Sequence, residues 1–168
     1  MSVQIIDNFL PEEHFRPLQQ LLMSFDFDWY YNDFILYREG AKSPNHEFQF
    51  IHNFYKPLVG VCSPHFNKLS SCFEALGAKT LVRVKANLGP KAEKPKTPEM
   101  HIDSTLDCKT AVFYINTNNG FTSLNEGSIV KSKENRMAIF DSNTLHTGTT
   151  CTDSKVRVLI NFNYFTSV

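Results

Sequence analysis

The feature that most constrains the fold is a change of pattern at Gly77. After this glycine, short extended segments separated by Gly, Asn, Ser and Pro continue to the end of the chain. Strands are expected over residues 80–88, 99–103, 110–116, 128–131, 136–140, 145–149 and 156–165. Many short strands with such breaks are typical of a sandwich or jelly roll. The sequence therefore predicts a mainly β fold.

The chain before Gly77 reads as two helices and some short strands. A helix is expected to begin at Pro11, because proline suits the first helical turn and the following Glu12 and Glu13 suit the helix dipole. Its apolar face would hold Phe15, Leu18, Leu21, Leu22 and Phe25. A second helical pattern covers residues 55–76, with a break near 63–64 and Gly77 as its C-cap. Strands are expected over 3–6, 27–31 and 34–37.

Length and composition set the class of protein. With 168 residues, 42% of them hydrophobic, the chain is expected to form one domain over residues 1–168. Seventeen basic residues balance seventeen acidic ones, so no net field favours nucleic acid or an anionic membrane. The four cysteines form no CxxC pair, and no segment has the pattern of a leader or a membrane span. A cytoplasmic protein is expected.

The sequence His101-Ile102-Asp103 is a candidate metal site. Residues i and i+2 of a strand share one face, so an extended backbone would point both ligands into one cavity. In a jelly roll, strands distant in sequence face each other, so His146 can reach the same ion. Two imidazoles and one carboxylate are the ligands of non-haem Fe(II) oxygenases.

The last strand carries an unusual polar face. Residues 156, 158, 160, 162 and 164 are apolar, whereas the alternate positions begin with Arg157 and include Asn161 and Asn163. A buried arginine needs an anionic partner, and a guanidinium binds a carboxylate through two parallel hydrogen bonds. A dicarboxylate would satisfy Arg157, although a solvated face is the simpler alternative.

Several elements match a known family in order and spacing. They are His101-Ile-Asp103, Thr110-Ala-Val-Phe-Tyr114-Ile-Asn116, Asn119-Gly-Phe-Thr122, Phe140-Asp-Ser-Asn-Thr-Leu-His146-Thr-Gly148 and Arg157 ahead of Asn-Tyr-Phe165. This run resembles the Fe(II)/2-oxoglutarate-dependent oxygenases, most closely their prolyl-hydroxylase-like branch. More loosely, residues 5–11 resemble the opening strand and helix start of that family.

The resemblance implies a double-stranded β-helix with two supporting N-terminal helices. It implies iron held by His101, Asp103 and His146, and 2-oxoglutarate held by Arg157 with help from Tyr114 and Thr110. In this family, 2-oxoglutarate and dioxygen yield succinate while a substrate is hydroxylated, and ascorbate can support the reaction. The substrate, a protein residue such as proline or a small molecule, is not identified by the sequence.

Some positions depart from the family pattern. Asn163 stands where relatives commonly carry tryptophan, and Asn119-Gly120 replaces the commoner double glycine. No arginine lies between Asp103 and Thr110, where some relatives use one toward substrate. Lys155 is the alternative to Arg157 as cosubstrate anchor, since some prolyl hydroxylases use lysine.

Two other functions remain open. A zinc hydrolase would use the same three ligands with water but leaves Arg157 and Tyr114 without a task. A non-catalytic jelly roll with a vestigial metal site is the alternative of another class. The loop near residues 38–50 is a candidate lid at the substrate entrance, and residues 89–98 form a second loop rich in proline and lysine.

Overall fold

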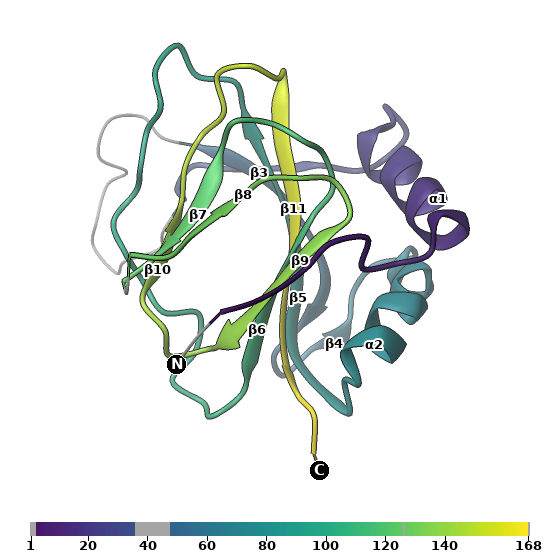
Figure 1. The fold of residues 1–168 in the computed structure, drawn as a ribbon. Coiled ribbons are helices and arrows are strands. Elements are labelled where there is room, and N and C mark those ends of the chain that lie inside the picture. The colour runs from purple at the N-terminus through teal and green to yellow at the C-terminus, as the bar shows by residue number, and fades with distance from the viewer. Residues whose placement is uncertain (1–2, 36–47, 126, 168) are drawn as a thin grey trace.

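Two antiparallel β-sheets stand face to face in the computed structural model, which describes residues 3–35, 48–125 and 127–167 (Figure 1). The larger sheet has the strand order β1 (Gln4–Ile6), β9 (Arg136–Asp141), β6 (Lys109–Tyr114), β11 (Val156–Phe165), β5 (Thr80–Pro90), β3 (Gln49–Lys56) and β2 (Tyr30–Asn32), with β4 (Gly60–Val61) paired to β3. The smaller sheet has the order β10 (His146–Gly148), β7 (Phe121–Leu124) and β8 (Ile129–Lys131). Most of the chain after Gly77 is thus extended, as its breaker pattern predicts.

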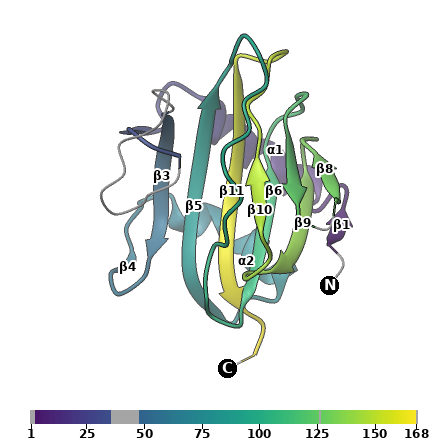
Figure 2. The same ribbon diagram turned by 90° about the vertical axis from the view of Figure 1, so that its left-hand side faces the viewer.

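The helices cover the outer face of the larger sheet, away from the smaller sheet (Figures 1 and 2). Helix α1 spans Glu12–Met23, and the short 3-10 turn η2 (Phe66–Leu69) leads into α2 (Ser70–Leu76). Their buried residues join the main core, which includes Phe15, Leu18, Leu22, Leu69, Cys72, Phe113, Ile160 and Phe162. A second apolar cluster between the two sheets contains Val112, Tyr114, Leu124, Val130, Ala138, Phe140 and Leu159.

Strand β11 lies between β6 and β5, and its two faces meet different surroundings. Val158, Ile160, Phe162 and Tyr164 are buried in the core under the helices. The alternate positions face the smaller sheet, where Leu159 is packed and Arg157 is only 8% exposed. The alternation predicted for this strand is confirmed, and the alternative of a solvated face for Arg157 is wrong.

The helix predicted over residues 55–76 is wrong in its first half. Residues 49–56 instead form strand β3, and a tight turn follows with Leu58 at φ 62° and Gly60 at φ 86°. Leu58 and Val61, the first two apolar positions of the predicted helix, are exposed, so their helical spacing does not mark a buried face. Only Ser70–Leu76 is α-helical, and Gly77 ends it with the expected left-handed backbone, at φ 61°.

Smaller differences concern element ends. Phe25 lies beyond the end of α1 and is 95% exposed, so it does not belong to the predicted apolar face. The predicted strand 27–31 is reduced to Tyr30–Asn32, and the predicted strand 34–37 extends beyond the described residues. Residues 99–103 form a single bridge, His101 to His146, instead of a strand. Strand β7 is an element that the sequence pattern does not predict.

The structure also describes the state of the cysteines and the character of the helices. All four cysteines are free, and Cys72, Cys108 and Cys151 are buried. Within the described chain, no helix is both long and apolar enough to cross a membrane.

Candidate metal centre and its cavity

His101, Asp103 and His146 come together between the two sheets. One ligand atom from each lies within 4.8 Å of the others, and the two imidazole ring centres are 4.6 Å apart. The backbone brings this about, because His101 and His146 exchange two N–H···O hydrogen bonds of 2.9 Å. The three predicted ligands therefore lie close enough for one ion.

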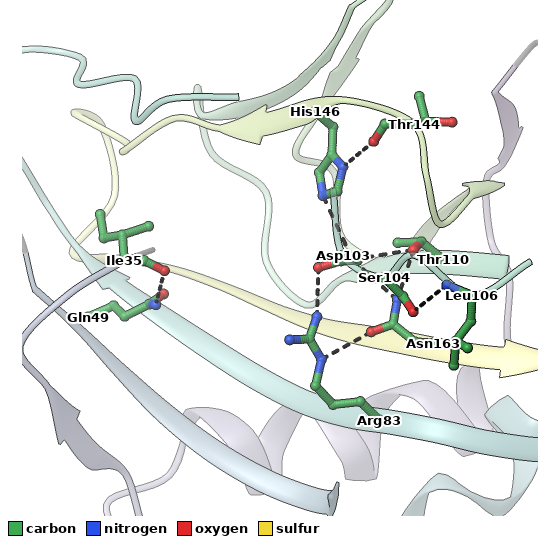
Figure 3. A network of polar contacts seen from close by, with 10 residues as sticks. All are labelled: Ile35, Gln49, Arg83, Asp103, Ser104, Leu106, Thr110, Thr144, His146 and Asn163. Atoms are coloured by element: carbon green, nitrogen blue, oxygen red, sulfur yellow. Dashed lines mark hydrogen bonds and ion pairs between the residues drawn. The ribbon is translucent and has the colours of Figure 1, made fainter. Parts of the chain in front are cut away.

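Hydrogen bonding leaves one nitrogen of His146 available. Nδ1 lies 2.9 Å from the carbonyl oxygen of Thr144. Since a carbonyl oxygen only accepts, Nδ1 carries the proton and donates it, and the lone pair sits on Nε2. Nε2 lies 3.8 Å from Oδ2 of Asp103 (Figure 3). His146 is thus oriented as a metal ligand.

His101 has the protonation state that a ligand needs. Burial, and after it the neighbouring His146, lower the pKa of His101 below its ordinary value, with Asp103 opposing them. The imidazole is therefore neutral at neutral pH. A hydrogen bond with the backbone of Glu99 acts to raise this pKa, but burial outweighs it, and Nδ1 is buried without a hydrogen bond of good geometry. A buried, neutral imidazole fits coordination to a cation.

Asp103 is held by three side chains from the larger sheet (Figure 3). Arg83 Nη2 donates to Oδ1 at 2.6 Å, while Asn163 Nδ2 and Thr110 Oγ1 each donate to Oδ2 at 3.3 Å. Burial acts to raise the pKa of Asp103, but Arg83, His146 and Asn163 outweigh it and the pKa is lowered. The carboxylate is therefore ionised and fixed in orientation.

Arg157 is a buried cation held by neutral groups. Its Nε donates to Ser132 Oγ at 2.9 Å, and its Nη2 donates to Thr122 Oγ1 at 3.2 Å. Burial lowers the pKa of the guanidinium, but arginine stays charged at neutral pH. No carboxylate in the described parts of the chain pairs with it. Within the described residues the charge has no anionic partner, so it is available to an anionic ligand.

Two glycines make room for this side chain. A Cβ atom on Gly120 would lie 2.7 Å from Cδ of Arg157, and one on Gly148 would lie 3.1 Å from Nη1. Real Cβ atoms do not approach as closely as the first of these distances, so residue 120 must be glycine while Arg157 keeps its position. The single glycine of Asn119-Gly120 is thus the one that the arginine requires.

The other two predicted cosubstrate residues lie in different places. Tyr114 is buried, its hydroxyl donates to Thr122 Oγ1 at 2.7 Å, and its ring lies 5.7 Å from the Arg157 guanidinium carbon. Thr110 lies beside Asp103, where it also accepts a hydrogen bond from Asn163 at 2.8 Å. Tyr114 is therefore next to the arginine, whereas Thr110 is next to the carboxylate ligand.

One cavity of about 950 Å³ joins the metal cluster to Arg157, whereas Tyr114 and Thr110 are not among its lining residues. His101, Asp103, His146 and Arg157 all line it. Phe48 and Gln49, the described part of the predicted lid near residues 38–50, also line it, as do Phe34 and Ile35 before it, while residues 36–47 lie outside the described part of the chain. The loop predicted over 89–98 contributes several further residues, among them Lys91 and Lys94. Lys155 is exposed and outside the lining.

Sequence reasoning missed Arg83 and Lys85, which line the cavity from β5. The available signal was two cations at alternate positions of a strand that leads toward the H-x-D sequence. It was overlooked because the polar face of a half-buried strand normally faces solvent.

Comparison with known proteins shows which solved structures share this fold. No protein-family model and no curated protein matches the sequence. The structure is similar to a Trichoplax adhaerens prolyl hydroxylase solved with a hypoxia-inducible-factor peptide, with a TM-score of 0.64 and 18% identity over 97% of this chain and 83% of that one. It is also similar to a Pseudomonas putida prolyl-4-hydroxylase, with a TM-score of 0.65 and 13% identity over 97% and 92% of the two chains.

A third similar structure does different chemistry. It is the epimerase SnoN in complex with Fe3+, alpha-ketoglutarate and nogalamycin RO, with a TM-score of 0.62 and 10% identity over 97% of this chain and 78% of that one. These likenesses show the fold. It is the double-stranded β-helix of the 2-oxoglutarate/Fe(II) oxygenases, prolyl hydroxylases among them, and the predicted fold class is confirmed.

Proposed function

We propose that this chain is a single-domain Fe(II)- and 2-oxoglutarate-dependent dioxygenase over residues 1–168, which hydroxylates a substrate. The observation that carries the proposal is the buried, unpaired Arg157 in the same cavity as a two-histidine, one-carboxylate cluster. A metal cluster alone would suit several enzymes. A cation next to the cluster can bind one carboxylate of a dicarboxylate whose other end reaches the metal.

The residues fit an Fe(II) ion. His101, Asp103 and His146 would hold it, since each has a ligand atom close to those of the others, His101 is neutral and Nδ1 of His146 is engaged with Thr144. Bound iron would supply dioxygen activation, with one oxygen atom entering succinate, the other entering the product hydroxyl group, and carbon dioxide leaving. Arg83 orients Asp103, and the carbonyl group of Thr144 orients His146, each through a hydrogen bond.

Arg157 would hold the far carboxylate of 2-oxoglutarate. A guanidinium has five N–H donors, and Ser132 and Thr122 occupy two of them. The remaining donors are available for a carboxylate in a site that excludes bulk water. Tyr114 supports the arginine through its ring and through the shared hydroxyl of Thr122. In this proposal Lys155 has no such role, because it is exposed and outside the cavity lining.

Arg157 also favours the oxygenase over the two alternatives. A zinc hydrolase would use the same three ligands but has no need of a buried cation beside them. A vestigial site in a binding module would not need to keep a charge whose burial costs stability. We also place the protein in the cytoplasm, where reducing conditions suit both Fe(II) and four free cysteines.

The test is formation of succinate from 2-oxoglutarate by the Fe(II)-loaded protein with ascorbate and oxygen. We expect uncoupled turnover in the unaltered protein and none above background in His101→Ala. Lys56→Ala, an exposed lysine outside the cavity, is the control and should keep the unaltered rate. Equal succinate formation by the unaltered protein and His101→Ala would reject the assignment.

A further inference from the structure

Strand β5 presents a row of polar side chains to the cavity. Arg83, Lys85 and Asn87 alternate along the strand and all line it. In the register with β11, Lys85 stands opposite Asn161, which also lines the cavity. Lys85 and Asn87 of this row belong neither to the metal ligands nor to the Arg157 anchor, so they are available to contact another molecule.

The two cations of this row differ in their partners. Arg83 is neutralised by Asp103 and also donates to Asn163 Oδ1 at 3.0 Å. The ammonium group of Lys85 makes no hydrogen bond or ion pair with any residue that the structure describes. Burial, and after it the charge of Arg83, lower the pKa of Lys85 to about 8, so at neutral pH it is mainly protonated. Among the described residues it is therefore a second cation of the cavity lining without an anionic partner.

Lys85 and Arg157 lie in different parts of the cavity. In the register of β5 and β11, Arg157 stands opposite Gly89, four residues from Lys85. At about 3.3 Å per residue these backbone positions are roughly 13 Å apart. Arg83, two residues from Lys85 on the same face of β5, contacts Asp103 at 2.6 Å, so Lys85 lies toward the metal cluster. A molecule bound at Lys85 would lie on the metal side of the cavity, where a substrate must reach.

The entrance is basic as well. Lys91, Lys94 and Lys96 line the cavity from the exposed loop after β5, with Glu93 among them. Across the described lining, six basic side chains stand against two carboxylates, of which Asp103 is a proposed metal ligand. Such a distribution attracts anions and raises their rate of entry.

We propose that Lys85, assisted by the amide of Asn161, binds an oxyanion of the substrate, so that the substrate is a small organic acid or a phosphate ester. This inference rests on the proposed oxygenase function. A cavity of about 950 Å³ has room for such a molecule beside 2-oxoglutarate. An uncharged proline residue in a peptide would leave Lys85 without a partner.

The test uses inorganic phosphate and acetate as probes. The full chain is loaded with Mn(II), with protein in excess over metal and with saturating 2-oxoglutarate, and paramagnetic relaxation of the phosphate ³¹P and acetate methyl signals is measured. We expect saturable relaxation by at least one probe, showing which oxyanion is preferred. Lys85→Met should weaken that binding by about 10- to 100-fold, the effect of losing a charge-assisted hydrogen bond.

Two controls separate the possible results. Lys56→Met removes an exposed lysine at the end of the neighbouring strand β3 and should leave probe binding unchanged. Lys85→Arg keeps the charge and should retain most of it. Equal relaxation in the unaltered protein and Lys85→Met would overturn the proposal. An equal loss of 2-oxoglutarate affinity in Lys85→Met would also overturn it, because Lys85 would then belong to the cosubstrate site.

If the proposed oxygenase function is wrong, the experiment gives a different result. If the Mn(II)-loaded protein does not bind 2-oxoglutarate, the oxygenase assignment falls. Phosphate and acetate titration of the metal-free protein, followed by chemical shifts with and without Lys85→Met, then decides on the oxyanion site alone. A Lys85-dependent titration would support the site, and its absence would reject it.

Discussion

Arg83 and Asp103 form an ion pair in which Nη2 of the arginine lies 2.6 Å from Oδ1 of the aspartate. The aspartate side chain is only 5% exposed, so the pair is shielded from solvent on that side. The arginine comes from β5, and the aspartate comes from the loop after the 89–98 segment. The pair therefore ties the proposed metal ligand to the larger sheet.

The first prediction concerns this pair. Arg83→Met should weaken Mn(II) binding by about 10- to 100-fold, the usual cost of losing a partner that orients a metal ligand. Titration followed by electron paramagnetic resonance measures it, and Arg16→Met, on the exposed side of α1, is the matched control. The charge of Arg83 also repels a cation. Tighter Mn(II) binding by Arg83→Met would show that repulsion outweighs positioning, and the orienting role of Arg83 would then be wrong.

The second prediction concerns Lys85 and pH. The pKa of Lys85 is about 8 in the folded protein, against 10.5 for an ordinary lysine. Below pH 8 both states are protonated and the full cost of burying the charge is present. Between pH 8 and 10.5 the folded state loses the proton first, and that cost disappears.

Lys85→Met should therefore stabilise the ligand-free protein at pH 7, by roughly 1 to 3 kcal/mol. The difference from the unaltered protein should shrink as the pH rises from 8 and should vanish near 10.5. Urea unfolding of both proteins at several pH values measures it. A difference that is constant with pH would mean that packing, and not charge, is responsible.

The third prediction concerns the slot for Arg157. Gly120→Ala would place a Cβ atom 2.7 Å from Arg157 Cδ and 2.8 Å from Asn118 Oδ1. Because both neighbours are buried, the substitution should destabilise the protein by about 1 to 3 kcal/mol, as overpacking does. Gly89→Ala, whose Cβ would meet its nearest atom at 3.9 Å, is the control for stability. Equal thermal unfolding of the two variants would contradict the packing described.

The sequence predicts much of the fold because its patterns report burial. Strand β11 is predicted over its full length, because one of its faces is apolar and the other is mainly polar, and both faces are largely buried. The first half of the helix predicted over residues 55–76 fails because Leu58 lies in an exposed turn and Val61 in the exposed strand β4, and apolar spacing cannot reveal exposure. Strand β7 escapes prediction because its four residues, Phe121–Leu124, alternate with Thr and Ser directly after the Asn-Gly turn signal and so resemble a continuation of the loop.

The candidate site likewise has residues that the sequence predicts and residues that it does not. The cluster of His101, Asp103 and His146 is predictable from residue type and from a fold that brings distant strands together. Arg83 and Lys85 are not, because alternation assigns residues to a face without telling what lies opposite that face. The smaller sheet and the 89–98 loop enclose the polar face of β5, which only the three-dimensional arrangement reveals.

The proposed function depends most on Arg157 binding the far carboxylate of 2-oxoglutarate at a metal-loaded site. The direct measurement is anaerobic titration of the Fe(II) form with 2-oxoglutarate, followed by charge-transfer absorption, in the unaltered protein, Arg157→Ala and Lys155→Ala. We expect binding that Arg157→Ala weakens by about 2 to 5 kcal/mol and Lys155→Ala leaves unchanged. No binding at millimolar 2-oxoglutarate, or a larger loss in Lys155→Ala than in Arg157→Ala, would contradict this role of Arg157.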